Sequence, residues 1–555
     1  MLESAFKQRL RKRIPSHVSI HFILLAACLG FTSTVQAGIH FTLMGSGSLP
    51  QAEEISLITE LKDSSLPLKK SLKSLYQLRN YKLIWSDGEK YNDNAKQLLS
   101  TIQQSHEFGL NAFDYDAESL QSFLQKSEAN PTLLGKSDIL FSHAYVKLAS
   151  HISRGKLTDS QATFNNEELL LATLNEGADN NAIHSTINDL QPKNNHYRNL
   201  VAALTNYKQI EARIDHQQAP LKLSKRSYQL GDYSSEIPKL RTLLHVYGDY
   251  RGNDLSSQLL DEPLMLAVSE FQSRHGLDTD GVVGKQTVRA LNTPIWKRIQ
   301  QLELNLARAR SLPDLSTGRH LLVNIPAYKL YLYDDQQLTY QSNVVVGKKK
   351  HKTPLITSEL TKIILSPYWN VPKSITYNEI VPAIQRDPNY LAKNNMKLLS
   401  TDSNQARIIN PETIDWFNID QANTNFRVRQ EPGVRNSLGN IKFIFPNRHS
   451  VYLHDTPSRR LFALPQRAFS HGCIRVEDPF GLAETLISND LGWSKYDLLD
   501  LSKQSKSKTV PLSESVPIHI TYMTAWADEQ GIVNFRPDIY NRDTQVLASL
   551  YNADN

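Results

Sequence analysis

The sequence predicts an α+β protein of several domains, in which helical domains precede a mostly β domain. Apolar residues recur about every three to four positions, the helical spacing, through most of the chain before residue 320. From His320 the apolar period changes to two, which is typical of strands with one buried face. A chain of 555 residues has room for roughly three to four domains of about 150 residues each.

The first 37 residues are typical of a secretory signal. Five Lys or Arg side chains, against one Glu, precede a short apolar stretch over residues 18–27, and a cleavage site is expected after Ala37. That stretch is shorter than the roughly 20 residues of a membrane-spanning helix. A retained N-terminal anchor and a lipoprotein acylated at Cys28 stay open as alternatives. We therefore expect export, with membrane attachment only if the N-terminus is retained or Cys28 is lipidated.

Charge and cysteine content narrow the classes of function. The formal charge of +6 falls to +2 without the net +4 of the signal segment, so nucleic acid is not an expected partner. Cys28 and Cys473 are the only cysteines. If Cys28 leaves with the signal, the exported chain keeps one thiol and can form neither an internal disulfide nor a cysteine-rich metal site. A lone thiol is often an inert buried side chain, but in an oxidising compartment its presence suggests a use.

Two helical domains are expected before residue 320. Residues 48–215 are predicted to be a helical scaffold domain without a catalytic constellation. Residues 233–292 are predicted to be a compact unit of three helices, in which Gly248 ends the first helix and Gly284 begins the last. The apolar face of the first helix comprises Ile237, Leu240, Leu244 and Tyr247. A three-helix bundle of no special function is the plainer interpretation of this unit.

A mostly β domain is expected over residues 319–505, with a helical, polar insertion over 377–425. An insertion of this length is often a lid or a binding loop, although decoration without function is an alternative. The Lys- and Ser-rich residues 501–515 are expected to form an exposed loop. Residues 516–555 are expected to return as a strand and then to pack on the scaffold or on the β domain.

The chemistry is expected at Cys473 and His454, which lie 19 positions apart next to residues of strand type. Two short strands ending at a shared cleft would bring thiol and imidazole within hydrogen-bond reach, as nucleophilic catalysis requires. His454 can hold a thiolate–imidazolium pair and return the proton to a leaving amine. Gly472 lets the backbone approach a substrate carbonyl, so that the N–H groups of Gly472 and Cys473 form an oxyanion hole. This arrangement indicates acyl transfer through a thioester.

His471 is the competing candidate for the base. It lies two residues before Cys473 on the same face of an expected strand and has little angular freedom, so we expect a structural or orienting role. A metal site built from His454, Asp455, His471 and Cys473 fits no common ligand spacing. Neither a metal nor a cofactor is expected.

His454, followed by Ser470-His471-Gly472-Cys473 and Arg475, resembles the signature of the L,D-transpeptidases of the YkuD fold. The likeness extends to further stretches: Pro432-Gly433, residues 436–439, Lys442-Phe443, residues 445–447, residues 455–457, Arg467-Ala468, residues 521–526 and residues 535–540. Residues 233–292 resemble a peptidoglycan-binding domain through Ala267-Val268, Gly276-Leu277 and residues 280–284. The order of scaffold, binding module and catalytic domain (319–505) is similar to the large periplasmic, YcbB-type members from Gram-negative bacteria.

This resemblance implies a reaction. Cys473 attacks the carbonyl of diaminopimelate, the third residue of a tetrapeptide stem, and expels D-alanine. The acyl group passes to the side-chain amine of another diaminopimelate as a 3→3 crosslink. His454 is the base, and the backbone carbonyl of Asp455 orients its imidazole. The insertion is the substrate-capping subdomain, and carbapenems are expected to acylate Cys473. The residues implied at the substrate or in the cleft wall are Arg475, Tyr452, Trp369, Ser470 and His471.

The implied partners are peptidoglycan stem peptides, with other cell-wall synthesis enzymes as candidates, in the periplasm of a Gram-negative bacterium. Three alternatives stay open. A papain-like or NlpC-type peptidase also uses Cys and His, but in that order along the chain. A wall-binding scaffold would leave the site idle. An L,D-carboxypeptidase would let water take the thioester instead of an amine.

Overall fold

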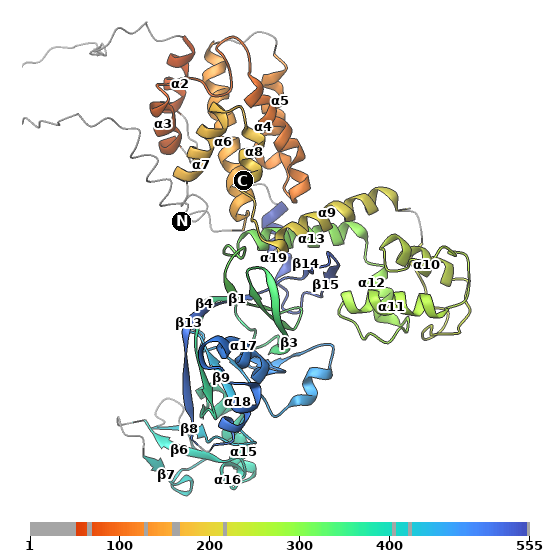
Figure 1. The fold of residues 1–555 in the computed structure, drawn as a ribbon, viewed down its shortest axis with the longest axis vertical. Helices are drawn as coiled ribbons and strands as arrows, with labels where there is room; N and C mark the ends of the chain where they lie inside the picture. The colour runs from red at the N-terminus through yellow and green to blue at the C-terminus, as the bar shows by residue number, and fades with distance from the viewer. Residues whose placement is uncertain are drawn as a thin grey trace, which may run out of the picture. The chain divides into compact units, whose positions relative to one another are not determined.

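The computed structural model describes residues 52–63, 69–126, 131–157, 167–214, 219–401, 407–419, 425–504 and 506–551 (Figure 1). The expected signal segment and Cys28 lie outside these residues. Within the described parts of the chain, no helix is both long and apolar enough to cross a membrane.

The N-terminal helices pack around the long helix α6 (Figure 1). Their bounds are α2 (Ala52–Asp63), α3 (Lys69–Leu78), α4 (Asp93–Gln103), α5 (Ala117–Leu124), α6 (Pro131–Arg154), α7 (Glu167–Asp179) and α8 (Ile183–Asp189). Two aromatic side chains of α6, Phe141 and Tyr145, pack against the buried ring of Trp85. The Asp138 carboxylate, also on α6, accepts a hydrogen bond from the Tyr76 hydroxyl at 2.5 Å, which ties α3 to α6.

Three short helices form the next unit: α10 (Ile237–Val246), α11 (Glu262–Arg274) and α12 (Lys285–Leu291). Their apolar faces share one core. The turn between α11 and α12 is held by Gln272, whose side-chain oxygen accepts from the Gly281 N–H and whose amide nitrogen donates to the Val282 carbonyl, both at 2.9 Å. Gly281 has a φ of +68°, a conformation that glycine adopts without steric cost.

A nine-stranded sheet forms the centre of the C-terminal half, in the order β11-β3-β12-β10-β9-β4-β13-β1-β2, with a further pairing of β2 with β3. The strands are β1 (Arg319–Asn324), β2 (Lys329–Asp334), β3 (Gln337–Gly347), β4 (Ile356–Leu365), β9 (Ile441–Ile444), β10 (Leu453–His454), β11 (Ala468–Ser470), β12 (Ile474–Val476) and β13 (Lys508–Thr521). Helices α17 (Pro479–Leu491) and α18 (Lys495–Ser502) add side chains such as Leu482 and Leu498 to the core of this sheet.

The insertion is only partly helical, which corrects the prediction for residues 377–425. Its helical part comprises α14 (Lys373–Ile375), η3 (Thr376–Ile380), α15 (Val381–Arg386) and α16 (Tyr390–Lys393). Four short strands form a separate sheet in the order β5-β8-β6-β7: β5 (Trp369–Asn370), β6 (Met396–Ser400), β7 (Ile408–Ile409) and β8 (Phe426–Gln430). Strands of two to five residues carry little period-two signal, and β5 and β8 lie outside the predicted range.

The expected loop over residues 501–515 is also wrong. Helix α18 ends at Ser502, and β13 then runs from Lys508 to Thr521 between β4 and β1. The first half of β13 is polar because most of its side chains are exposed, while its backbone pairs with β4. The polar composition of this segment therefore led to the prediction of a loop. The sheet continues past residue 505, the predicted end of the β domain.

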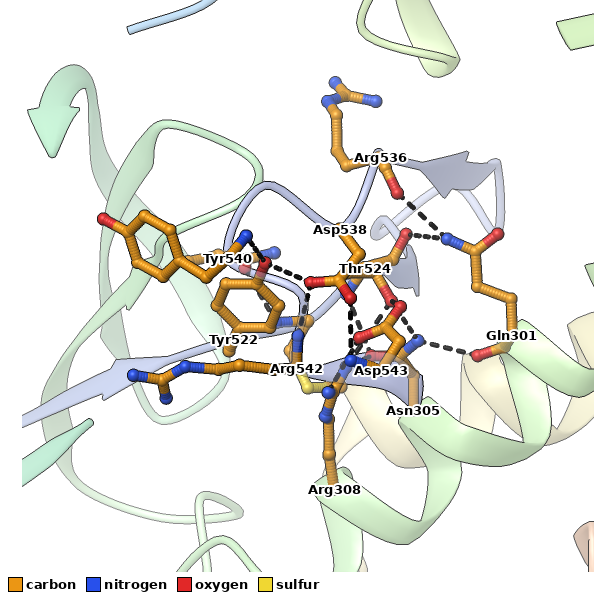
Figure 2. Close-up of polar contacts among 12 residues, drawn as sticks. Gln301, Asn305, Arg308, Tyr522, Thr524, Arg536, Asp538, Tyr540, Arg542 and Asp543 are labelled. Carbon is orange, nitrogen blue, oxygen red and sulfur yellow. Dashed lines mark hydrogen bonds and ion pairs between the residues drawn. The ribbon is translucent and has the colours of Figure 1, made fainter. Parts of the chain in front are cut away.

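The C-terminal segment contacts both the scaffold helices and the sheet. Strands β14 (Ala525–Ala527) and β15 (Val533–Phe535) share a core with α9 (Asn195–Arg213) and α13 (Ile295–Arg310). Tyr540 belongs to the core of the nine-stranded sheet, and α19 (Asp543–Tyr551) follows it. Figure 2 shows the polar contacts that join this segment to α13, including an ion pair between Arg308 and Asp543 at 2.8 Å. Together these elements confirm the predicted fold class.

Candidate active site

His454 lies on β10, and Cys473 immediately precedes the neighbouring strand β12, near the middle of the nine-stranded sheet. Strands β10 and β12 pair in parallel, with Leu453 opposite Ile474 and His454 opposite Arg475. The Ile474 N–H donates to the Tyr452 carbonyl at 3.2 Å, so the start of β12 is held against the start of β10. Cys473 immediately precedes β12 and therefore lies beside Tyr452, one residue before His454 on the neighbouring strand.

The imidazole of His454 is held by a backbone carbonyl group. Its Nδ1 lies 2.5 Å from the Asp455 carbonyl oxygen, and because a carbonyl can only accept, Nδ1 carries the proton. Nε2 is then the nitrogen that can accept a proton. Burial, followed by the nearby Arg475 guanidinium, lowers the pKa of His454 to about 3, so the imidazole is neutral at physiological pH.

The thiol of Cys473 is half-buried, and its Sγ–H points to the Ser450 carbonyl at 3.9 Å. Burial raises the pKa of the Cys473 thiol, while hydrogen bonding from Tyr452 and the cations Lys442 and Arg475 act in the opposite direction. Since the thiol pKa is raised and the His454 pKa is lowered, both groups are neutral at rest. The thiol donates to the Ser450 carbonyl, and among the described residues the expected hydrogen bond between thiol and imidazole is not formed.

Tyr452 forms part of the wall around the thiol. Its ring packs edge-on against the His454 ring, with centroids 5.7 Å apart. Burial and the adjacent Cys473 raise the pKa of the Tyr452 hydroxyl, and a hydrogen bond with Trp369 on β5 lowers it. Tyr452 thus links the predicted wall residue Trp369 to Cys473.

Lys442 stands in a stretch that carries the family likeness, but no role in the site was predicted for it. It lies on β9 directly opposite His454, and its Nζ is 4.0 Å from the centre of the Tyr452 ring. Burial lowers the pKa of Lys442, and the neighbouring Cys473 raises it. A lysine in an alternating strand usually faces solvent, so only the register of β9 against β10 reveals its place here.

Arg475 supplies a second cation. Burial lowers the pKa of its guanidinium, and proximity to Cys473 raises it. Its Nε is buried and, within the described residues, has no hydrogen-bond partner. A buried donor without an acceptor is costly unless something else binds it, which makes Arg475 a candidate contact for an anionic substrate group.

Asp455 acts on His454 through its backbone, and its carboxylate has other partners. The carboxylate accepts from the Asn440 N–H at 2.9 Å and forms an ion pair with Arg459 at 3.1 Å. Burial raises the pKa of this carboxyl group. A Cβ at Gly439 would come within 2.2 Å of the carboxylate, so the turn before β9 needs glycine there.

Ser470 and Gly472 shape the turn that carries Cys473, the predicted nucleophile, and this turn is called the nucleophile turn below. The buried Ser470 hydroxyl accepts from the Gly472 N–H at 3.1 Å and donates to the Cys473 carbonyl at 2.5 Å. Gly472 has a φ of +117°, which ends the extended chain after β11. The Gly472 N–H is therefore occupied, whereas the Cys473 N–H has no acceptor within the described residues.

His471 lies on this turn rather than on a strand, because Gly472 breaks the extended backbone. Its Nε2 is 2.7 Å from the Glu379 carboxylate of the insertion and 3.3 Å from Lys348 Nζ. Its ring is 5.0 Å from that of His351. His471 thus connects the nucleophile turn to the insertion. Among the described residues, no group of three or more His, Cys, Asp or Glu side chains is arranged to hold a metal ion.

Comparisons with known proteins match three parts of the chain. A model of the YkuD L,D-transpeptidase catalytic domain matches residues 318–491, a scaffold-domain model matches 70–204, and a peptidoglycan-binding model matches 233–291. A Haemophilus influenzae protein named "Putative L,D-transpeptidase" is 38% identical over 255 residues, which are 46% of this chain and 50% of that protein. The match thus spans half the length of this curated relative.

Two solved structures are similar at low identity. An L,D-transpeptidase from Stackebrandtia nassauensis is 13% identical, with a TM-score of 0.22, over 54% of this chain and 97% of its own. An L,D-transpeptidase from Xylanimonas cellulosilytica is 15% identical, with a TM-score of 0.16, over 54% of this chain and 100% of its own. Scores this low add no support, so the assignment depends on the family models and the curated relative. Residues 318–491 of this protein therefore match the L,D-transpeptidase catalytic domain of the YkuD family, and residues 233–291 of the same chain match the model described as a "Putative peptidoglycan binding domain".

Proposed function

We propose that the chain is a cysteine-dependent L,D-transpeptidase that forms 3→3 crosslinks between diaminopimelate residues of peptidoglycan stems. One observation carries this proposal. His454 ends β10 and Cys473 immediately precedes β12, the strand parallel to it inside the matched domain, and the Asp455 carbonyl holds the imidazole as the tautomer that can accept a proton.

In the first half-reaction, Sγ of Cys473 adds to the carbonyl carbon of the third stem residue while Nε2 of His454 takes the thiol proton. The carbonyl π electrons move to the oxygen, which becomes an oxyanion. When this intermediate collapses, the C–N bond breaks and the imidazolium gives its proton to the leaving D-alanine amine. A thioester on Cys473 and neutral His454 remain.

In the second half-reaction, the side-chain amine of another diaminopimelate attacks the thioester carbonyl and gives a proton to His454. The C–S bond breaks, and the cysteine sulfur takes that proton back as it leaves. The neutral resting pair supports this route, because the imidazole is available as a general base before the thiol ionises.

The cations of the site fit an anionic donor. Stem peptides carry carboxylates on diaminopimelate and on D-alanine, and the guanidinium of Arg475 offers an Nε that has no partner among the described residues. Lys442 adds positive charge next to the thiol. Tyr452 and Trp369 wall the cleft, Ser470 holds the turn, and the Cys473 N–H is the better placed oxyanion donor because the Gly472 N–H is bonded to Ser470.

The place of action is part of the same proposal. The N-terminal segment exports the chain to the periplasm of a Gram-negative bacterium, and the peptidoglycan-binding domain holds it near the wall. The insertion, which contacts the nucleophile turn through Glu379 and His471, caps the bound stem.

Incubation of purified residues 38–555 with a disaccharide-tetrapeptide, read by mass spectrometry, tests the proposal, with Cys473→Ala as the control. A crosslinked dimer that lacks one D-alanine, formed only by the wild type, is the expected product. Tripeptide monomer alone would assign a carboxypeptidase. Neither product and no adduct on Cys473 would make the chain a wall-binding scaffold.

A further inference from the structure

The peptide bond between Gly472 and Cys473 must be held in one orientation for the Cys473 N–H to meet an oxyanion. In a trans peptide the C=O and N–H point in opposite directions, so the direction of the Gly472 carbonyl sets the direction of the Cys473 N–H. Glycine permits many backbone angles, and Gly472 already has a φ of +117°. The Gly472 residue alone does not prevent this peptide from turning over.

Thr353 holds the Gly472 carbonyl. Its Oγ1 donates to that oxygen at 2.9 Å and accepts from the Gly347 N–H at 2.9 Å. The direction of the hydroxyl proton follows, because the Gly347 N–H can only donate and the Gly472 carbonyl can only accept. Thr353 is 0% exposed, so water does not compete for these bonds.

Tyr540 holds Thr353 in turn. Its hydroxyl accepts from the Thr353 N–H at 3.2 Å and donates to the Gly347 carbonyl at 2.5 Å. Gly347 and Thr353 are the two ends of the loop over residues 347–353, so Tyr540 ties these ends together. The same loop reaches the nucleophile turn a second time, through the Lys348 N–H and the Ser470 carbonyl at 2.9 Å.

Tyr540 is itself fixed by the C-terminal segment (Figure 2). Its N–H donates to the Tyr522 hydroxyl at 2.8 Å, and that hydroxyl donates to Asp538 at 2.6 Å. Asp538 also accepts from the Arg542 and Asp543 amides at 2.9 and 2.8 Å. These residues lie beyond residue 491, where the match to the catalytic-domain model ends.

From these contacts we propose that Thr353 and Tyr540 are positioning residues that orient the Gly472–Cys473 peptide and so aim the Cys473 N–H at the oxyanion. The catalytic unit then includes the C-terminal segment. The inference rests on the proposed function, since it assigns a role in acylation of Cys473.

Two reactions of the Cys473 thiol distinguish a loss of peptide orientation from a general disruption of the site. Acylation by a carbapenem passes through an oxyanion, whereas alkylation by iodoacetamide does not. In the full chain, Thr353→Val removes the hydroxyl at nearly constant volume and is expected to slow acylation on the order of 10- to 100-fold. Its alkylation rate is expected to stay within about twofold of the wild type, and Thr353→Ser, which keeps the hydroxyl, is expected to restore acylation.

Tyr540→Phe tests the residue that holds Thr353 and is expected to slow acylation by roughly 3- to 10-fold. Tyr551→Phe is its matched control, because that C-terminal tyrosine donates to Glu303 rather than to the loop over 347–353. Acylation of Thr353→Val at the wild-type rate would overturn the inference, as would an equal fall in acylation and alkylation. A wild type that no carbapenem acylates would instead count against the proposed function.

Discussion

The candidate active site and the polar contacts that hold the C-terminal segment, here called the anchor (Arg308, Asp538 and Asp543), both contain buried or partly buried charges. They differ in how these charges are paired. In the anchor, Arg308 is paired with Asp543, and Asp538 accepts three hydrogen bonds (Figure 2). Beside the thiol, Lys442 lies over an aromatic ring, and the Nε of Arg475 has no partner within the described residues.

The C-terminal region has the pairing that favours stability, and the site around the thiol does not. Paired groups offset the cost of burying charge, whereas cations left without counter-charges lower stability. Such a cost is expected where a ligand supplies the missing partner. The pKa values follow this difference at Asp538 but not at Asp543, whose pKa is raised by burial in spite of its ion pair. Partial burial acts to raise the pKa of Asp538, but its hydrogen bonds hold it below the usual value. The pKa of His454 is lowered by burial first.

The largest expected effect is the loss of transpeptidation on substitution of Cys473 or His454, which leaves the C-terminal segment unchanged. Cys473→Ala and His454→Ala are each expected to lower the rate of transpeptidation by at least about 10³-fold while the protein stays folded. The rate of dimer formation measures the loss, and circular dichroism monitors the fold. Retention of more than a tenth of the rate in either variant would remove that residue from the mechanism.

The pH dependence of alkylation tests the neutral pair. The pKa of Cys473 is raised, and that of His454 is about 3, so no imidazolium stabilises a thiolate between pH 5 and 8. The thiolate fraction then rises about tenfold per pH unit, or roughly 10²-fold from pH 6 to 8. Iodoacetamide kinetics measure this rise. A rate that is already constant below pH 7 would show an ion pair instead.

Breaking the anchor is expected to affect stability rather than chemistry. Asp543→Asn leaves Arg308 unpaired in a largely buried place, and we expect a loss of about 2 kcal/mol in the free energy of unfolding. Urea unfolding measures it. The acylation rate of the folded protein should stay unchanged. Asp500→Asn, in an exposed pair with Lys503, is the control and should change stability little. Equal losses in both variants would contradict the distinction.

Removing a cation beside the thiol is expected to lower the reactivity of the thiol without lowering the stability of the protein. Lys442→Met leaves the unfolding free energy the same or higher, because a poorly paired buried charge is lost. The thiol pKa should rise further, and alkylation at pH 8 should fall by roughly 3- to 10-fold. Lys362→Met, on the neighbouring strand β4 and exposed, should change neither quantity. A Lys442→Met variant that is less stable but reacts normally would make Lys442 a structural residue.

The smallest expected effect concerns the contact between the insertion and the nucleophile turn. Glu379→Gln weakens a partly exposed ion pair with His471 and should raise KM for the donor by about two- to fivefold with little change in kcat. Glu412→Gln, elsewhere in the insertion, provides the comparison. Steady-state kinetics that show equal KM values for the two variants would remove the contact from substrate capping.

Much of the fold was predictable because helical and strand periods are local. The change of period at His320 and the turn glycines of the three-helix unit mark real elements. The polar half of β13 and the two- to five-residue strands of the insertion were missed, since backbone pairing with distant strands stabilises them in spite of their composition.

The residues of the candidate site likewise divide into those with a local sequence signal and those placed only by distant contacts. Cys473 and His454 stand in a motif that can be found without a structure. Lys442 depends on the register of β9 against β10, and Thr353 and Tyr540 act across 119 and 187 residues of sequence. No local pattern indicates such contacts. The exposure of the thiol and imidazole, which sets their pKa directions, also follows only from packing.

The central claim is that Cys473 forms a thioester with the donor stem, with neutral His454 as the base. The most direct test quenches the wild type in acid during turnover with a tetrapeptide donor and maps the adduct by mass spectrometry. We expect a tripeptide-stem acyl group on the peptide that contains Cys473, with one D-alanine released per adduct, and a much smaller amount in His454→Ala. A crosslinked product formed with no adduct at Cys473, or an adduct on another residue, would contradict it.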